Sequence, residues 1–121
     1  MNNYGQKEIF MTNIINLTPH TINIYNADGN EVTKFESMGI ARADSFETVV
    51  GELNGIPVVE MTYGAPVGLP DPTDDTVYIV SMLTIQAAIQ VGRTTSDLYT
   101  TADLVRNDKG QIIGCRKLSR V

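Results

Sequence analysis

The chain has little of the chemistry that cysteine and histidine provide, because its 121 residues include one of each, Cys115 and His20. A single cysteine excludes an internal disulfide framework, so the fold depends on its hydrophobic core. One histidine and one cysteine far apart in the sequence do not make a zinc site of the usual kind. Asp71, Asp74 and Asp75 lie close together but lack the glycine and glutamate spacing of a calcium loop, which leaves open only a magnesium or calcium ion held by carboxylates in another way. We therefore predict no metal site and no cofactor.

Long apolar segments are also lacking. The longest apolar stretch, residues 77–91, is interrupted by polar residues and is shorter than the roughly 20 residues that a membrane span needs. Residues 1–11 contain no apolar core of the kind found in a signal peptide. We therefore expect a cytoplasmic protein without a membrane partner. Because translation could begin at Met11, we predict a flexible extension at residues 1–12 and a single domain at residues 13–121.

Positive charge is scarce, and it is unevenly distributed. The net charge of −5 divides into −8 for residues 1–75 and +3 for residues 76–121. An acidic chain with a pI of about 4.6 lacks the broad basic face that duplex nucleic acid requires, so we exclude that partner. The basic last third could still hold a small anion, although charged residues on a half-buried sheet are also ordinary solvation.

Turn residues predict three hairpins. Alternating apolar residues lead into the turn at residues 26–30 and return through Val32 and Phe35. The second hairpin runs over residues 46–63 and turns at Asn54 and Gly55, the strongest short turn signal. The third covers residues 104–118, with its turn at residues 108–110.

Between the second and third hairpins the pattern changes. Residues 64–72 hold two glycines and three prolines and predict an irregular loop, and residues 76–80 are a β-branched run that predicts a central strand. The next residues have helical spacing, with Ser81 placed as the N-cap and Gly92 as the terminator. Residues 93–101 are polar and unperiodic and predict a loop. The fold class is therefore α+β, a mainly antiparallel sheet of short hairpins with one helix. One helix covers one face of the sheet, so we expect a homo-oligomer that covers the other.

A first candidate site is the segment Asn16, Thr18 and His20 around Pro19, which fixes a bend. Amide, hydroxyl and imidazole groups close together could orient a ligand. The alternative is a turn whose side chains cap their own backbone, with His20 bonded to a neighbouring carbonyl. Arg42 is a further candidate that either points into a cleft or solvates a strand edge.

A second candidate site is the start of the predicted helix. A helix N-terminus has free N–H groups and a partial positive charge, so it suits phosphate or carboxylate, and the hydroxyls of Ser81 and Thr84 could add to it. Ordinary capping explains the same residues without a ligand. Neither of the glycine-rich motifs of dinucleotide and P-loop sites is present.

A third candidate site is the loop that follows the helix. Arg93, Thr94, Asp97 and Tyr99 could supply phosphate contacts, ribose contacts and a stacking surface. The alternative is a polar surface loop with a local pair between Arg93 and Asp97. We expect this loop and the turn at Ser81 to converge on one anionic ligand.

The sequence resembles a family of small proteins of phages and bacteria that share an N-terminal Asn-Leu-Thr-Pro-His motif. The resemblance rests on residues 15–20, 68–70, 77–81, 93–97, 104–110 and 113–116. The family typically has a loop proline after the Arg…Asp segment, where this chain continues through Tyr99. The family itself implies no activity. Small acidic phage proteins without a catalytic set are often inhibitors of host defence, and by analogy the phage context suggests such a role.

We therefore expect a non-catalytic anti-defence protein that binds and sequesters a nucleotide immune signal, such as a cyclic ADP-ribose derivative. No catalytic set is visible, since Cys115 lies in a predicted strand as a small core residue and His20 has no partnered nucleophile. One alternative is a small enzyme acting on a nucleotide or sugar phosphate, with His20 as base and Arg93 holding the phosphate. The other is a protein–protein interaction or virion module.

Overall fold

The strands and the helix follow the apolar pattern of the sequence and its turn residues. The structure is a computed structural model that describes residues 12–121, so the predicted flexible extension lies outside the described residues except for Thr12. In chain order the elements are β1 (Asn13–Asn16), β2 (Ile22–Tyr25), β3 (Glu31–Phe35), β4 (Ser45–Leu53), β5 (Ile56–Tyr63), β6 (Thr76–Ile79), α1 (Met82–Gln90), β7 (Leu98–Arg106) and β8 (Ile112–Ser119).

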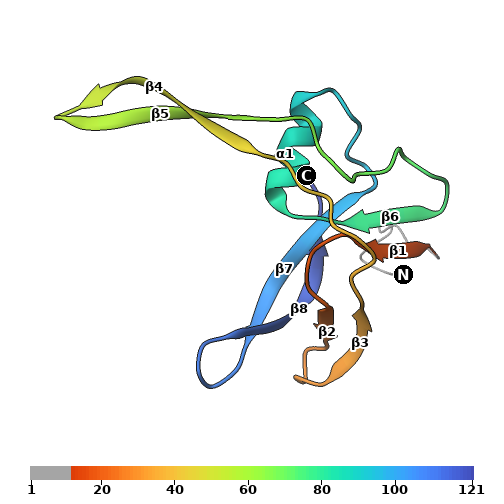
Figure 1. Ribbon diagram of the computed structural model, residues 1–121. Helices are drawn as coiled ribbons and strands as arrows, with labels where there is room; N and C mark the ends of the chain where they lie inside the picture. The colour runs from red at the N-terminus through yellow and green to blue at the C-terminus, as the bar shows by residue number, and fades with distance from the viewer. Residues whose placement is uncertain (1–11) are drawn as a thin grey trace, which may run out of the picture.

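Six of the strands form one mixed sheet in the order β1-β6-β7-β8-β2-β3 (Figure 1). The pairs β2–β3 and β7–β8 are antiparallel hairpins, as predicted. The pairs β1–β6, β6–β7 and β2–β8 are parallel, which the hairpin pattern does not anticipate. The α+β class is confirmed, with a sheet that joins hairpins through parallel neighbours.

The sheet curves until its two ends meet. Asn16 at the end of β1 forms a parallel bridge with Ser37, which follows β3. Inside the curve, Ile22, Ile79 and Cys115 form a buried apolar cluster. The strands of this sheet therefore enclose part of the core themselves.

Helix α1 packs beside β6 and the start of β7, at one end of the molecule (Figure 1). Its Ile85 and Ala88 pack with Tyr78, Val80 and Leu98 in a second buried cluster. The helix begins after Ser81 as predicted, because the Ser81 side chain accepts from the backbone N–H of the third helical residue. The helix ends just before Gly92, the predicted terminator. Gly92 has a φ of 80°, a conformation that favours glycine over other residues.

Two of the hairpin turns use the same chemistry. Asn26 and Asn107 each accept hydrogen bonds at Oδ1 from the backbone N–H groups two and four residues later, at 2.9–3.0 Å. Gly29 and Gly110 follow at φ values of 86° and 78°. These contacts replace ladder hydrogen bonds within the turn and confirm the predicted positions of both turns.

The prediction of a loop over residues 93–101 is wrong from Leu98 onward. Leu98 and Tyr99 pair with Tyr78 and Ile79 of β6, and β7 then continues as a strand. Leu98 is fully buried beneath α1, so the packing of one apolar side chain outweighs the polar residues around it.

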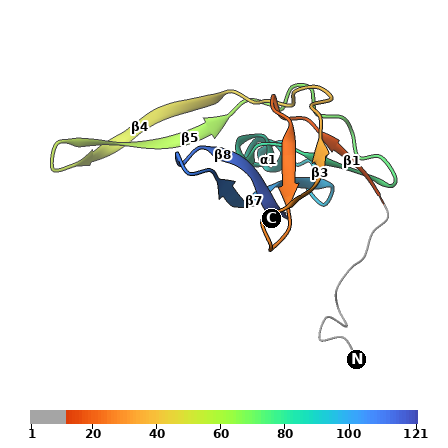
Figure 2. The ribbon, with the colours of Figure 1, turned by 90° about the horizontal axis from the view of Figure 1, so that it is seen from below.

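Strands β4 and β5 form a separate two-stranded ribbon that projects from the rest of the molecule (Figure 2). Asn54 and Gly55 turn the chain with φ values of 50° and 82°, as the sequence predicts for a two-residue hairpin turn. We call residues 45–63 the arm.

Candidate functional site

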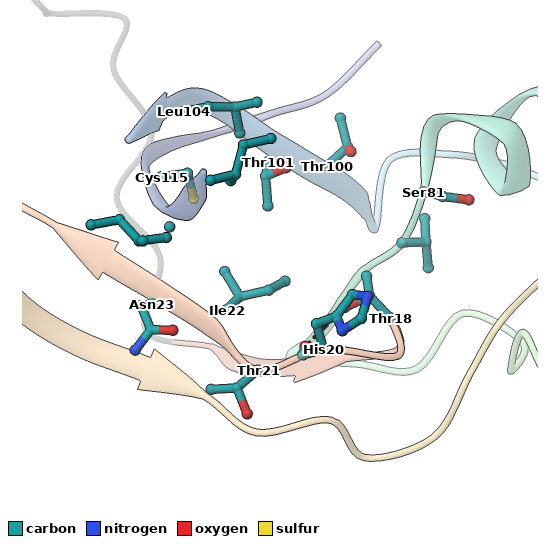
Figure 3. Close-up of a pocket in the computed structure, with 14 residues that line it drawn as sticks. Thr18, His20, Thr21, Ile22, Asn23, Ser81, Thr100, Thr101, Leu104 and Cys115 are labelled. Carbon is teal, nitrogen blue, oxygen red and sulfur yellow. Dashed lines mark hydrogen bonds between the residues drawn. The ribbon is translucent and has the colours of Figure 1, made fainter. Parts of the chain in front are cut away.

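A pocket of about 640 Å³ opens between β2 and the β7–β8 hairpin (Figure 3). Beside the pocket, β2 and β8 pair at a single position, Ile24 opposite Cys115. Val80 and Ser81, which lead from β6 into α1, close one end. The lining residues are Thr18, His20, Thr21, Ile22, Asn23, Val80, Ser81, Thr100, Thr101, Leu104, Ile112, Ile113, Gly114 and Cys115.

Three of the predicted site residues, Thr18, His20 and Ser81, reach this pocket. Figure 3 shows the imidazole of His20 beside Thr18 at one end, with Ser81 across from them at the start of the helix. The structure thus brings the first and second candidate sites together at one cavity.

Asn16 and Thr18 hold the turn that presents His20. The fully buried Asn16 side chain donates from Nδ2 to the carbonyl oxygens of His20 (2.7 Å) and Phe35 (2.9 Å). Its Oδ1 accepts from the Thr18 backbone N–H (2.9 Å) and from the Thr18 hydroxyl (2.7 Å). Asn16 is therefore fully engaged in capping the backbone, which is the structural alternative considered for this segment. The backbone carbonyl of His20 accepts the hydrogen bonds from Asn16 and Thr18, and the imidazole side chain of His20 remains exposed.

The hydroxyls at the helix start are similarly engaged. Ser81 Oγ accepts from the Thr84 backbone N–H at 3.2 Å and lies 3.0 Å from Thr84 Oγ1. Thr84 is fully buried and donates to the carbonyl oxygen of Ala41 at 3.2 Å. Thr84 therefore serves the packing of α1, and Ser81 is the member of this pair that lines the pocket.

Arg93 and Asp97 form a bidentate ion pair. Arg93 Nη1 and Nη2 each lie 2.9 Å from a carboxylate oxygen of Asp97, and the side chains are 14% and 11% exposed. The same two nitrogens donate to the carbonyl oxygens of Thr94 and Pro70, at 2.7 Å each. Arg93 Nε is buried and has no acceptor among the described residues. The guanidinium thus fastens the loop after α1 to the proline-containing loop before β6.

The remaining predicted site residues lie away from the pocket lining. Thr94 is exposed, and its hydroxyl lies 3.4 Å from that of Ser96. Tyr99 lies in β7, where its carbonyl accepts from Val80 at 2.8 Å. The backbone of Arg42 exchanges two hydrogen bonds with the backbone of Val67, at 2.9 and 2.7 Å. Arg42 is exposed.

The expectation that Ser81 and Arg93 converge on one ligand is wrong. Ser81 is the N-cap of α1, whereas Arg93 follows the C-terminal end of the same helix. A helix of nine residues is about 14 Å long, so Ser81 and Arg93 lie at opposite ends of α1, about that distance apart along its axis. The Arg93 side chain is also occupied by the ion pair with Asp97.

Sequence reasoning did not single out the residues of β7 and β8 that line the pocket. Thr100 and Thr101 fall in the segment that the sequence predicts as a loop, and Leu104 and Ile113 fall in the predicted third hairpin. The β-branched pair at 100–101 beside buried Leu98 was the available signal for a strand at this position. Cys115 also lines the pocket. The residue is fully buried, and burial raises the pKa of its thiol.

No family model, no curated protein and no solved structure matches the chain. Over residues 12–121, no three histidine, cysteine or carboxylate side chains gather in a way that could hold a metal ion. In the same range no helix has the length and apolar character to cross a membrane.

Proposed function

We propose that the protein binds a small nucleotide in the pocket between β2 and the β7–β8 hairpin and holds it without transforming it. The observation that carries this proposal is a cavity of about 640 Å³ in which apolar walls alternate with hydroxyls and one imidazole. Pockets for small molecules typically have this size, a mostly apolar lining and a few polar groups that fix orientation.

The lining suits the separate parts of a nucleotide. Ile22, Leu104 and Ile113 offer apolar surface to a base, and the hydroxyls of Thr100 and Thr101 are suitable partners for a ribose. Among residues 12–121, no lysine or arginine lines the cavity. The phosphate must therefore rely on the imidazole of His20, which attracts anions when protonated, and on the N-terminal end of α1.

Two features favour binding over turnover. Among residues 12–121, no carboxylate forms a hydrogen bond with the His20 side chain, so nothing orients the imidazole as a general base. The thiol of Cys115 is buried and its pKa is raised, which keeps it in the protonated and poorly nucleophilic form at neutral pH. The enzyme alternative gives the role of base to His20 and uses Arg93 to hold the phosphate, and Arg93 is already paired with Asp97.

The cellular role in the proposal comes from the resemblance to small phage and bacterial proteins. We propose that the bound molecule is a nucleotide immune signal, such as a cyclic ADP-ribose derivative, and that sequestration protects an infecting phage. This role places the protein in the cytoplasm, where such a signal is made. No duplex nucleic acid and no membrane takes part in it.

Thermal unfolding and calorimetry with ADP-ribose, cyclic ADP-ribose isomers, cyclic AMP and AMP test the proposal. A nucleotide present at 100 times its dissociation constant should add about 2.7 kcal/mol to the free energy of unfolding. His20→Ala should weaken binding about tenfold. It should leave the fold intact, because the exposed imidazole makes no hydrogen bond with any of the residues that the structure describes. Arg42→Ala is the matched control, since exposed Arg42 lies outside the pocket lining.

Release of the ligand by heat, followed by mass analysis, separates binding from catalysis. Intact nucleotide supports the proposal. A converted product that His20→Ala does not form would replace it with the enzyme alternative, and failure of every nucleotide to raise the unfolding temperature would overturn it.

A further inference from the structure

The arm, residues 45–63, is attached to the rest of the described chain mainly at its base. Figures 1 and 2 both show it extending far from the body of the molecule. At the base, the Gly64 backbone N–H donates to the Asp44 carbonyl oxygen at 2.9 Å. The Tyr63 backbone N–H donates to Oε1 of Gln90, in the last turn of α1, at 2.9 Å. The two strands otherwise bond mainly to each other, in the antiparallel ladder that runs from Ser45–Tyr63 to Leu53–Ile56.

The arm exposes apolar side chains on both of its faces. All nine residues of β4 are exposed. Val49 pairs with Val59 on one face, and at the tip Leu53 pairs with Ile56. Val49 is 66% exposed and Leu53 is 68% exposed. An isolated two-stranded hairpin is at best marginally stable in water, and large exposed apolar patches mark interaction sites. The arm therefore needs a partner surface.

Charge identifies the kind of surface that fits. The arm carries Glu47, Glu52 and Glu60 and no lysine or arginine. Residues 98–121, which contain the β7–β8 hairpin, carry five basic and two acidic residues and so have a net charge of +3. The same hairpin exposes apolar Leu104 and Ile112. The chain thus contains an acidic apolar ribbon and a basic apolar hairpin.

We propose that two copies of the chain form a dimer in which the arm of each copy lies against the β7–β8 hairpin of the other. Pairing of two arms is disfavoured because it sets six glutamates against one another without a compensating base. The reciprocal arrangement uses one pair of surfaces twice, as a two-fold symmetric dimer requires. Leu104 and Ile112 also line the pocket, so the partner's arm would lie at the pocket rim. The dimer does not depend on nucleotide and should form without it.

Sedimentation of the unmodified chain at micromolar concentration and low salt should give twice the mass of the 13.2 kDa chain. Raising the salt concentration should weaken association, because the charges that steer it are exposed and screened. A monomer at about 100 μM under low salt would overturn the proposal, and would leave the nucleotide proposal to be judged by its own binding assay.

Two charge reversals identify the contact. Replacing Glu47, Glu52 and Glu60 by lysine should give a monomer, and so should replacing Arg106, Lys109 and Lys117 by glutamate in a second variant. Mixing the two variants should restore a dimer of one copy of each, because both contacts are then complementary again. That restoration also shows that both variants are folded.

The control must carry the same change of charge elsewhere. Replacing Asp28, Asp71 and Asp74 by lysine alters three exposed acidic residues outside the arm, and this variant should remain a dimer. A hairpin variant that still dimerises with itself would overturn the proposed contact in favour of arm–arm pairing. Failure of the mixture to form a dimer would overturn it as well.

Discussion

The guanidinium of Arg93 meets the carboxylate of Asp97 in a two-pronged contact, with both N–O distances at 2.9 Å. Because both side chains are largely buried, Asp97→Ala leaves a desolvated cation without its partner. We expect this change to lower the free energy of unfolding by about 3 to 5 kcal/mol, measured by urea denaturation.

The double variant Arg93→Ala/Asp97→Ala should lower the free energy of unfolding by less than the sum of the two single variants, because each single change leaves the other charge buried without its partner. Lys34→Ala is the control. It removes an exposed pair with Glu36 at 3.5 Å and should cost less than about 1 kcal/mol. Additive losses at Arg93 and Asp97 would show that the pair is not coupled.

Replacement of Asn16 tests the turn that presents His20. Asn16→Ala removes the donor to the Phe35 carbonyl and one donor to the His20 carbonyl, and it leaves a space in a fully buried position. We expect the free energy of unfolding to fall by about 3 kcal/mol. Exposed Asn30→Ala should change it by less than about 0.5 kcal/mol. Equal effects of the two changes would contradict the role assigned to Asn16.

The buried thiol of Cys115 predicts a dependence of stability on pH. Burial raises the pKa of Cys115, so the unfolded chain loses the thiol proton at a lower pH than the folded chain does. The fold therefore keeps its full contribution from Cys115 below the thiol pKa of the unfolded chain, which is about 8.5. That contribution falls as the pH rises from there toward the higher pKa of the folded state.

Urea denaturation of the unmodified chain and of Cys115→Ala at pH 7, 8, 9 and 10 measures this effect. Other groups titrate in the same range, so the difference in stability between the two proteins is the relevant quantity. It should shrink above pH 8. A difference that stays constant over this range would contradict the prediction.

Gly114 allows β2 and β8 to approach each other at the edge of the pocket. A Cβ at this position would collide with the Asn23 carbonyl oxygen and with the ring of Tyr25. Gly114→Ala should therefore lower the free energy of unfolding by about 1 to 3 kcal/mol and widen the pocket at this edge. Gly51→Ala is the matched control, because an added Cβ there meets nothing within 4 Å. Similar thermal shifts for the two variants would refute the argument.

Local elements could be read from the sequence because short-range chemistry determines them. Asn54 and Gly55 adopt the positive φ values that their hairpin turn requires, and Ser81 caps the helix it precedes. The turn at Asn107 and Gly110 can be predicted for the same reason.

Parallel pairing could not be read, because it joins segments that are distant in sequence and leaves no turn signal. The pairing of Ile24 with Cys115 is an example, and Cys115 lines the pocket. The site was accordingly predicted in part. Thr18, His20 and Ser81 do lie together, but Arg93 is held on the far end of α1 by Asp97 and by the carbonyl of Pro70.

The pairing of β2 with β8 has a consequence for biogenesis. As the nascent chain leaves the ribosome, β2 and β3 can form their hairpin early, but the other side of β2 finds its neighbour only after Cys115 has emerged. Until then Ile22 and Ile24 lie on an open strand that other chains could join. Contacts this distant in sequence slow folding. Translation speed and chaperone access during the last part of synthesis should therefore decide how much of the protein reaches its native state.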